Sequence, residues 1–190
     1  MSTSGAASSG RIVRPARAVG RGLGAVALLG FGAVLLQVSF VPYIRIADGI
    51  PDLVACVVVA VALLRGRLVG AVTGFACGLL VELAAPVGTL GVLALLYLAV
   101  GWWCGRYAER SEPPPLAVQI GLIVLAAAVV QAGYAIVQVL LGSDVPGAFT
   151  VSHVVLPCVF LTGLLAAPVL LVARRLLGAP RALEPFQVPR

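Results

Sequence analysis

Two carboxylates, Asp52 and Glu82, lie within or at the edge of long apolar stretches of this sequence. Acids within or at the edge of an apolar segment are costly to bury and are often functional. Glu82 could form an ion pair with Arg45, and Asp52 is a second candidate partner for the same guanidinium. The alternative for Glu82 is a hydrated carboxylate at an interface, because Pro86 and Gly88 predict a turn close by.

No catalytic constellation accompanies these acids. The chain has one histidine, no set of His and acidic residues with metal-ligand spacing, and no glycine-rich phosphate loop between a strand and a helix. A protease with two acids would need them in facing segments at similar depth, and we expect Asp52 and Glu82 both to lie near the surface. We therefore expect a protein that is not an enzyme and that holds no metal and no cofactor.

Amide and hydroxyl side chains form a second group of polar candidates. Gln131, Tyr134 and Gln138 share one helical face of an apolar segment, and Gln37 and Thr162 stand alone in two other segments. Hydrogen bonds between helices are one explanation, each worth about 0.6–1 kcal/mol inside a membrane. A substrate cavity is the other explanation, and the sequence leaves both open.

Glycine recurs at every fourth position from Gly66 through Gly70 and Gly74 to Gly78. On a helix these glycines form one bare stripe, which permits close contact between helix backbones in a membrane. The stripe either packs inside the protein or receives the helix of a partner protein. In both cases we expect the third apolar segment to be the most tightly packed helix.

The elements that must position these residues follow from composition. The 190 residues are 61% hydrophobic and 11% charged, whereas soluble domains contain about 25% charged residues. The chain has too few charges to cover a surface that faces water. Its apolar sequence divides into six segments, so we expect an all-α, polytopic membrane protein with a six-helix transmembrane bundle.

The arginines give the orientation of that bundle. All 13 basic residues are arginines. Except for Arg45, they form four clusters on alternate sides of the six segments. The clusters are Arg11/Arg14/Arg17/Arg21, Arg65/Arg67, Arg106/Arg110 and Arg174/Arg175/Arg181/Arg190. Arginine near a span stays on the cytoplasmic side, so we expect a multi-pass plasma-membrane protein with both termini in the cytoplasm. The basic face suits anionic lipids, and its division among loops argues against nucleic acid.

Turn residues and charges set the expected boundaries. We expect a disordered cytoplasmic N-terminus at 1–21, a bundle at 22–175 and a cytoplasmic tail at 176–190. The expected spans are about 23–41, 50–64, 68–83, 89–104, 116–141 and 151–173. Pro51 fits the first turn of the second span, and Asp48 or Asp52 can cap it. Spans two and three are short, which implies a thinned bilayer or shielding by neighbouring helices.

Several of these features occur together in an order that resembles a known family. The pattern consists of Leu36-Gln37, Phe40-Val41-Pro42, Pro51-Asp52-Leu53, Gly74-Phe75-x-x-Gly78-Leu79-Leu80-x-Glu82-Leu83 and Gly88-Thr89-Leu90-Gly91. It resembles the bacterial rod shape-determining protein MreD family over roughly residues 23–106. The family usually has Asp where this chain has Glu82, a change that keeps the charge.

The resemblance implies a non-catalytic scaffold of the cell-elongation machinery that regulates cell shape and peptidoglycan synthesis. It also implies an MreC-like bitopic membrane protein as partner, together with a SEDS glycosyltransferase and its transpeptidase, above cytoplasmic MreB filaments. The MreD family is similar in fold to the substrate-binding subunits of energy-coupling-factor vitamin transporters, which are six-helix bundles. A small-molecule binding subunit of a membrane transporter is therefore the alternative function.

Overall fold

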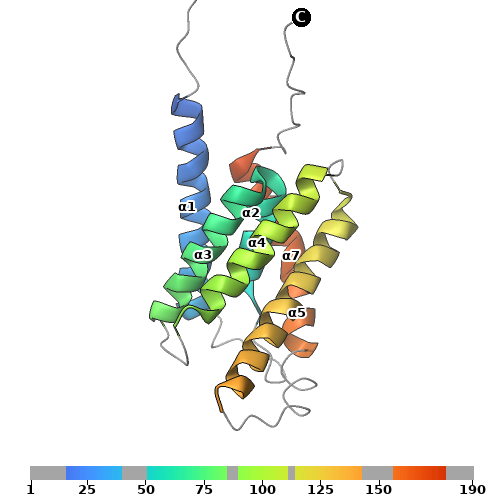
Figure 1. Ribbon diagram of the computed structural model, residues 1–190. Coiled ribbons are helices and arrows are strands. Elements are labelled where there is room, and N and C mark those ends of the chain that lie inside the picture. Colours follow the sequence, from blue (N-terminus) through green and yellow to red (C-terminus); the bar gives the residue numbers. More distant parts are fainter. Residues whose placement is uncertain (1–15, 40–50, 85–89, 111–113, 143–155, 179–190) are drawn as a thin grey trace, which may run out of the picture.

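The computed structural model describes residues 16–39, 51–84, 90–110, 114–142 and 156–178 (Figure 1). All regular structure within these ranges is α-helical. The helices are α1 (Ala16–Ser39), α2 (Leu53–Arg65), α3 (Arg67–Ala84), α4 (Val92–Arg110), α5 (Leu116–Leu140) and α7 (Leu156–Leu177). Four of the described helices, α1, α3, α5 and α7, are long and apolar enough to cross a membrane. The chain is thus an all-α, multi-pass membrane protein.

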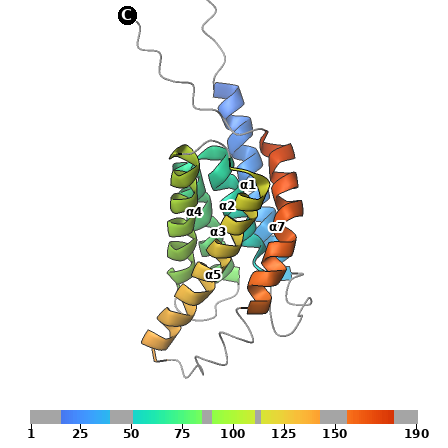
Figure 2. The same ribbon diagram turned by 90° about the vertical axis from the view of Figure 1, so that its right-hand side faces the viewer.

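Helix α2 forms the centre of the molecule. Every residue from Val54 to Leu64 is buried, and α2 contacts all five of the other described helices. Figure 2 shows α4 and α7 on opposite sides of the molecule, with α2 between them. A helix that is apolar on all faces belongs in the interior. At 13 residues it is about 20 Å long, so shielding by its neighbours explains how such a short segment is accommodated.

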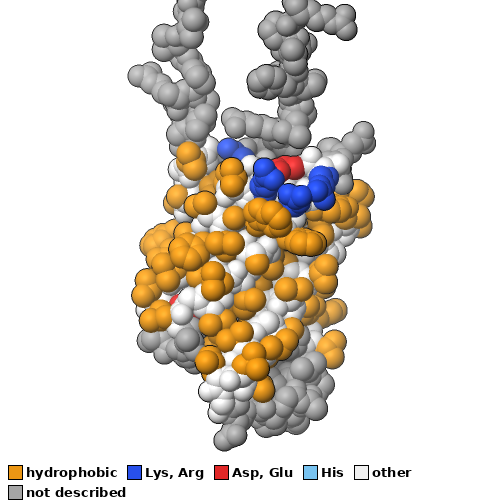
Figure 3. Space-filling model, in the orientation of Figure 1, with side chains coloured by type: hydrophobic (Ala, Val, Ile, Leu, Met, Phe, Trp, Pro, Cys, Tyr) orange, Lys and Arg blue, Asp and Glu red, His pale blue; other side chains and the backbone are white. Residues whose placement is uncertain are grey.

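The exterior is apolar because the outer helices present large side chains to the surroundings (Figure 3). Leu28 on α1, Leu68 on α3, and Phe160 and Leu164 on α7 are each at least 70% exposed. An apolar exterior of this extent on several helices is what contact with lipid requires. The arginine side chains that are visible in the same view gather at one end of the molecule.

Helices α3 and α4 lie against each other along the glycine stripe. A methyl group added to Gly78 would lie 2.6 Å from Ala94 Cα, and one added to Gly70 would lie 2.8 Å from the Gly101 carbonyl oxygen. A methyl group on Gly74 would overlap the Tyr97 carbonyl group. The stripe therefore packs inside the protein against α4, and α4 covers it.

Gly66 has a different role from the other three glycines. It follows the last residue of α2 with a φ of 88°, a left-handed conformation that favours glycine. The expected spans 50–64 and 68–83 leave only residues 65–67 as a connection, and the structure has a tight turn there, at Gly66. The expectation that Gly66 lies on the helical stripe is wrong, because the chain has to reverse there before α3 can begin.

Several expected boundaries differ from those of the structure. Helix α1 begins at Ala16, inside the segment expected to be disordered, and α4 continues to Arg110 through residues expected to form a loop. Helix α7 continues to Leu177. In each case Arg, Ala or Leu extends the helix past the apolar segment, because these residues favour helix and arginine can leave the hydrocarbon region at a helix end.

Candidate functional site

The side chain of Asp52 lies at the buried N-terminus of α2. Its Oδ1 accepts a hydrogen bond from the Ala55 backbone N–H at 2.8 Å, which confirms Asp52 as the N-cap of the helix. Tyr97 of α4 directs its hydroxyl at the same carboxylate, with its oxygen 2.9 Å from Oδ1 and 2.8 Å from Oδ2. Asp52 is 3% exposed and Tyr97 is 5% exposed, so this contact lies in the interior.

Thr162 connects α7 to the backbone of the same residue. The Asp52 N–H donates to Thr162 Oγ1 at 2.9 Å. The Thr162 hydroxyl in turn donates to the Cys158 carbonyl oxygen one helical turn earlier, at 2.7 Å. Thr162 is 0% exposed, so it can fill this position only because both its lone pair and its proton are used.

Gln37 of α1 holds the chain on both sides of Asp52. Its Nε2 donates to the Pro51 carbonyl oxygen at 3.0 Å, and its Oε1 accepts from the Leu53 N–H at 2.8 Å. Four helices therefore meet through Gln37, Pro51, Asp52, Tyr97 and Thr162, which we name the Asp52 junction. Pro51 precedes the N-cap and so lies outside α2, whereas the sequence suggested the first helical turn.

The junction satisfies the groups that a buried helix end leaves unpaired. The first N–H groups of a helix have no partner within it, and in a membrane each unpaired group costs several kcal/mol. Here a carboxylate and an amide oxygen accept from two of them, the N–H groups of Ala55 and Leu53. Within the described residues, every buried side-chain nitrogen and oxygen has a hydrogen-bond partner.

Asp52 lies deep within the molecule. It lies 13 positions before Arg65, the last residue of α2, which is about 20 Å along the helix. The expectation that Asp52 lies near the surface does not hold for the surface of the protein, because this side chain is buried. The physical reason is the shortness of α2, which begins inside the bundle, where the surrounding helices extend past it.

Glu82 carries out a similar task at the end of α3. Its Oε2 accepts from the Gly91 N–H and its Oε1 accepts from the Leu93 N–H, both at 2.7 Å. The carboxylate thus covers the N-terminus of α4, where the helix dipole favours negative charge. Glu82 is 5% exposed, so it is buried and not a hydrated interfacial group. Its suggested partner Arg45 lies outside the described residues.

The remaining polar candidates lie on α5 and are also bonded within the protein. Gln131 donates its amide N–H to Cys158 Sγ at 3.2 Å, beside the Asp52 junction. Gln138 donates to the Tyr134 hydroxyl oxygen at 3.0 Å, one turn apart on the same helix. Of the two explanations left open by the sequence, hydrogen bonding between helices fits Gln37, Gln131 and Thr162, whereas Gln138 bonds within α5.

Tyr97 is the member of the junction that sequence reasoning missed. It sits in an apolar stretch of α4 that otherwise contains no polar side chain between Val92 and Gly101. A buried tyrosine needs a partner for its hydroxyl, and that isolation is the signal that could have identified it. No cluster of three or more potential metal ligands occurs among the residues that the structure describes.

Comparison of the chain with protein-family models, with curated proteins and with solved structures gives no match. The class of protein therefore rests on the architecture itself. It is a multi-pass, all-helical membrane protein built around a short central helix, whose N-terminus is held by side chains from three other helices.

Proposed function

We propose that the chain is a non-catalytic scaffold of the bacterial cell-elongation machinery, of the kind that the MreD family provides. On this proposal it is a six-span bundle in the plasma membrane, with both termini in the cytoplasm. It binds an MreC-like bitopic protein and acts with a SEDS glycosyltransferase and its transpeptidase.

The observation that carries the proposal is the closed character of the Asp52 junction. Its polar groups are bonded to one another and to helix ends, and Asp52 and Tyr97 are at most 5% exposed. A junction of this kind fixes the relative positions of helices and leaves no buried polar side-chain atom of the described residues free for a ligand. A rigid helical platform is what a membrane scaffold has to offer its partners.

The residues that carry the resemblance also occupy the main contacts between helices. Pro51-Asp52-Leu53 starts α2 within the Asp52 junction. Gly74 and Gly78 touch the α4 backbone, and Glu82 caps that helix. A small-molecule binding subunit would need Gln37 and Thr162 to face a cavity, and both are bonded to the α2 terminus, so the scaffold is the better supported function.

Depletion of the protein in its own host tests the proposal. We expect rod-shaped cells to lose their shape and new peptidoglycan to lose its normal zones of insertion. Solubilised full-length protein should also recover an MreC-like partner. Cells that keep their shape and their pattern of wall growth after depletion would show that the scaffold proposal is wrong.

A further inference from the structure

The arginine-rich end of the molecule has an uneven distribution of partners. Arg65 donates to the Leu177 carbonyl oxygen at 3.1 Å, and Arg174 donates to Gln119 Oε1 at 2.9 Å. Arg67 forms an ion pair with Glu109 at 3.4 Å. Three guanidinium groups of this end are therefore held by groups of the protein itself.

Arg106 and Arg110 on α4 differ from those three. The Arg106 guanidinium carbon lies 5.2 Å from the centre of the Trp102 ring, a cation–π contact that orients the group without neutralising it. Arg110 is exposed. Neither forms an ion pair with any residue that the structure describes.

The one described acid at this end is already occupied. Glu109 lies between the two arginines in the sequence, but its carboxylate accepts from the Arg67 N–H at 3.0 Å and pairs with the Arg67 guanidinium. The positive charge of Arg106 and Arg110 is therefore uncompensated within the described part of the chain. A ligand with negative charge would supply what the protein does not.

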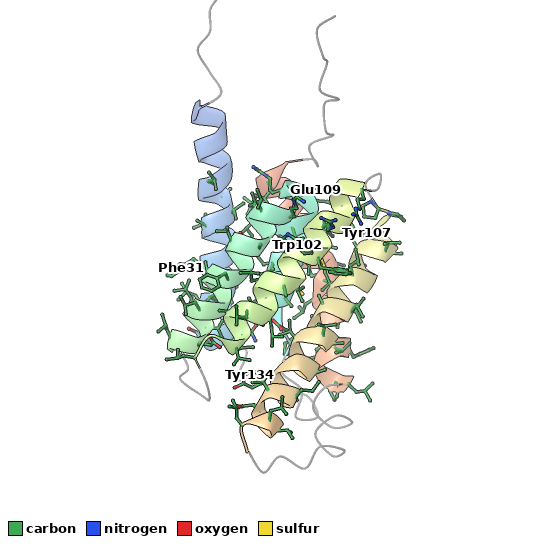
Figure 4. All side chains as sticks on the ribbon, viewed as in Figure 1. Phe31, Trp102, Tyr107, Glu109 and Tyr134 are labelled. Carbon is green, nitrogen blue, oxygen red and sulfur yellow. The ribbon has the colours of Figure 1, made fainter. Side chains whose placement is uncertain are left out.

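The surface beneath these arginines is aromatic and then aliphatic. Trp102, Trp103 and Tyr107 are 36%, 69% and 40% exposed, and Leu95, two turns before Trp102, is 62% exposed. Figure 4 shows Trp102 and Tyr107 toward the same end as Glu109, with Tyr134 toward the other end. Along one face of α4 the surface thus changes from aliphatic to indole and phenol and then to guanidinium.

We propose that this face of α4 binds one anionic phospholipid, with its phosphate at Arg106 and Arg110, its glycerol region at Trp102 and Trp103, and an acyl chain along Leu95. Indole rings favour the membrane interface, and guanidinium groups bind phosphate oxygens in bidentate fashion. Arg106 follows Trp102 by about one helical turn and Arg110 by about two, so their Cα atoms lie about 6 and 12 Å beyond that of Trp102 along the helix. This site does not depend on the scaffold function.

The aromatic content of the chain makes the site directly observable. Trp102 and Trp103 are the two tryptophans of the whole sequence, so all indole fluorescence originates at the proposed site. Full-length protein is reconstituted in phosphatidylcholine that contains either brominated phosphatidylglycerol or the same mole fraction of brominated phosphatidylcholine. Bromine on the acyl chains quenches tryptophan on contact, and the quenching gives the relative association of the two lipids.

We expect phosphatidylglycerol to associate roughly 5-fold or more strongly than phosphatidylcholine, because one surface arginine contributes about that factor. The double variant Arg106→Gln/Arg110→Gln should reduce the ratio to near 1. The double variant Arg106→Lys/Arg110→Lys should retain part of the preference because the charge remains. The matched control is Arg175→Gln on α7, on the opposite side of the molecule (Figure 2), which should leave the ratio unchanged.

Equal quenching by the two brominated lipids in the wild-type protein would overturn the proposal, whatever the variants do. An equal loss of preference in Arg175→Gln would also overturn it, because the effect would then reflect the total charge of this end and not a site on α4. Circular dichroism and size-exclusion chromatography check that each variant remains folded. Neither outcome bears on whether depletion alters cell shape.

Discussion

At the scale of single residues, the central question is how a carboxylate remains stable in the interior of a membrane protein. Asp52 is surrounded by neutral donors, namely the Ala55 N–H and the Tyr97 hydroxyl, and not by a described cation. Each of these donors would itself be unpaired without the carboxylate. The acid and its partners are thus stabilised together, and removal of either should expose the cost of burying the other.

Replacement of Asp52 should separate its hydrogen bonds from its charge. Asp52→Asn keeps an oxygen for the Ala55 N–H, so we expect a loss of about 1 kcal/mol in unfolding free energy. Asp52→Leu leaves buried donors unpaired and should cost about 2–4 kcal/mol. Equilibrium unfolding in mixed micelles measures both. Equal losses in the two variants would contradict the view that hydrogen bonding is the main contribution.

Tyr97 and Tyr107 offer a matched pair on α4. Tyr97→Phe removes the hydroxyl that donates to Asp52, and we expect a loss of about 1–3 kcal/mol because the buried carboxylate loses a donor. Tyr107 is 40% exposed, so Tyr107→Phe should change the unfolding free energy by less than about 0.5 kcal/mol. A similar effect of both substitutions in the same unfolding assay would argue against a special role for Tyr97.

At the scale of elements, the α3–α4 pair is set by close backbone contact. Helices in lipid gain little from burying apolar surface against each other, so contact between backbones and small residues matters more. This contact runs along α3 through Gly70, Gly74 and Gly78. Beyond Gly78, the Glu82 carboxylate accepts hydrogen bonds at the N-terminus of α4. The pair therefore behaves as one unit, closed by a carboxylate at one end.

Gly74→Ala should separate α3 from α4. The added methyl group would meet the Tyr97 carbonyl group, which is backbone and cannot turn aside, so we expect a loss of about 1–3 kcal/mol. Gly121 on α5 has no atom within 4 Å of the equivalent position, and Gly121→Ala should be neutral or stabilising by up to about 1 kcal/mol. Thermal unfolding in detergent compares the two, and a neutral Gly74→Ala would refute tight packing here.

At the scale of the whole molecule, the arginines whose side chains the structure describes gather at one end. The turn between α2 and α3, the end of α4 and the end of α7 all carry arginine, and Figure 3 shows basic side chains at that end above an apolar belt. If arginine is retained in the cytoplasm, this turn and these two helix ends must lie on the same side of the membrane.

Reporter fusions test that orientation in cells. We expect a reporter fused after residue 112 to lie in the cytoplasm, because this site follows Arg106 and Arg110. We expect a reporter fused after residue 86 to lie in the periplasm. Alkaline phosphatase and a cytoplasmic fluorescent protein at the same sites give complementary readouts. Phosphatase activity at residue 112 would overturn the orientation.

The sequence was sufficient for features that depend on local pattern. The apolar segments, the turn at Gly66 and the capping by Asp52 follow from composition and spacing, and the structure contains each of them. The depth of Asp52 and the contact with Tyr97 could not be predicted, because they depend on which helix faces meet across the bundle. A single sequence shows which residues share a face of one helix, but it does not show which other helix packs against that face. Asp52 and Tyr97 are 45 residues apart, so their contact depends on such packing.

The Asp52 junction also has a consequence for biogenesis. The Asp52 N–H depends on Thr162, a residue 110 positions further along the chain, so translation must supply α7 before this group finds its acceptor. Until then α2 lacks its contacts with α7 and the hydrogen bond from the Asp52 N–H to Thr162. It would therefore be held in the translocon or beside a chaperone. A nascent chain arrested before residue 156 should accordingly remain crosslinkable to the insertion machinery through α2, and release should coincide with the arrival of α7.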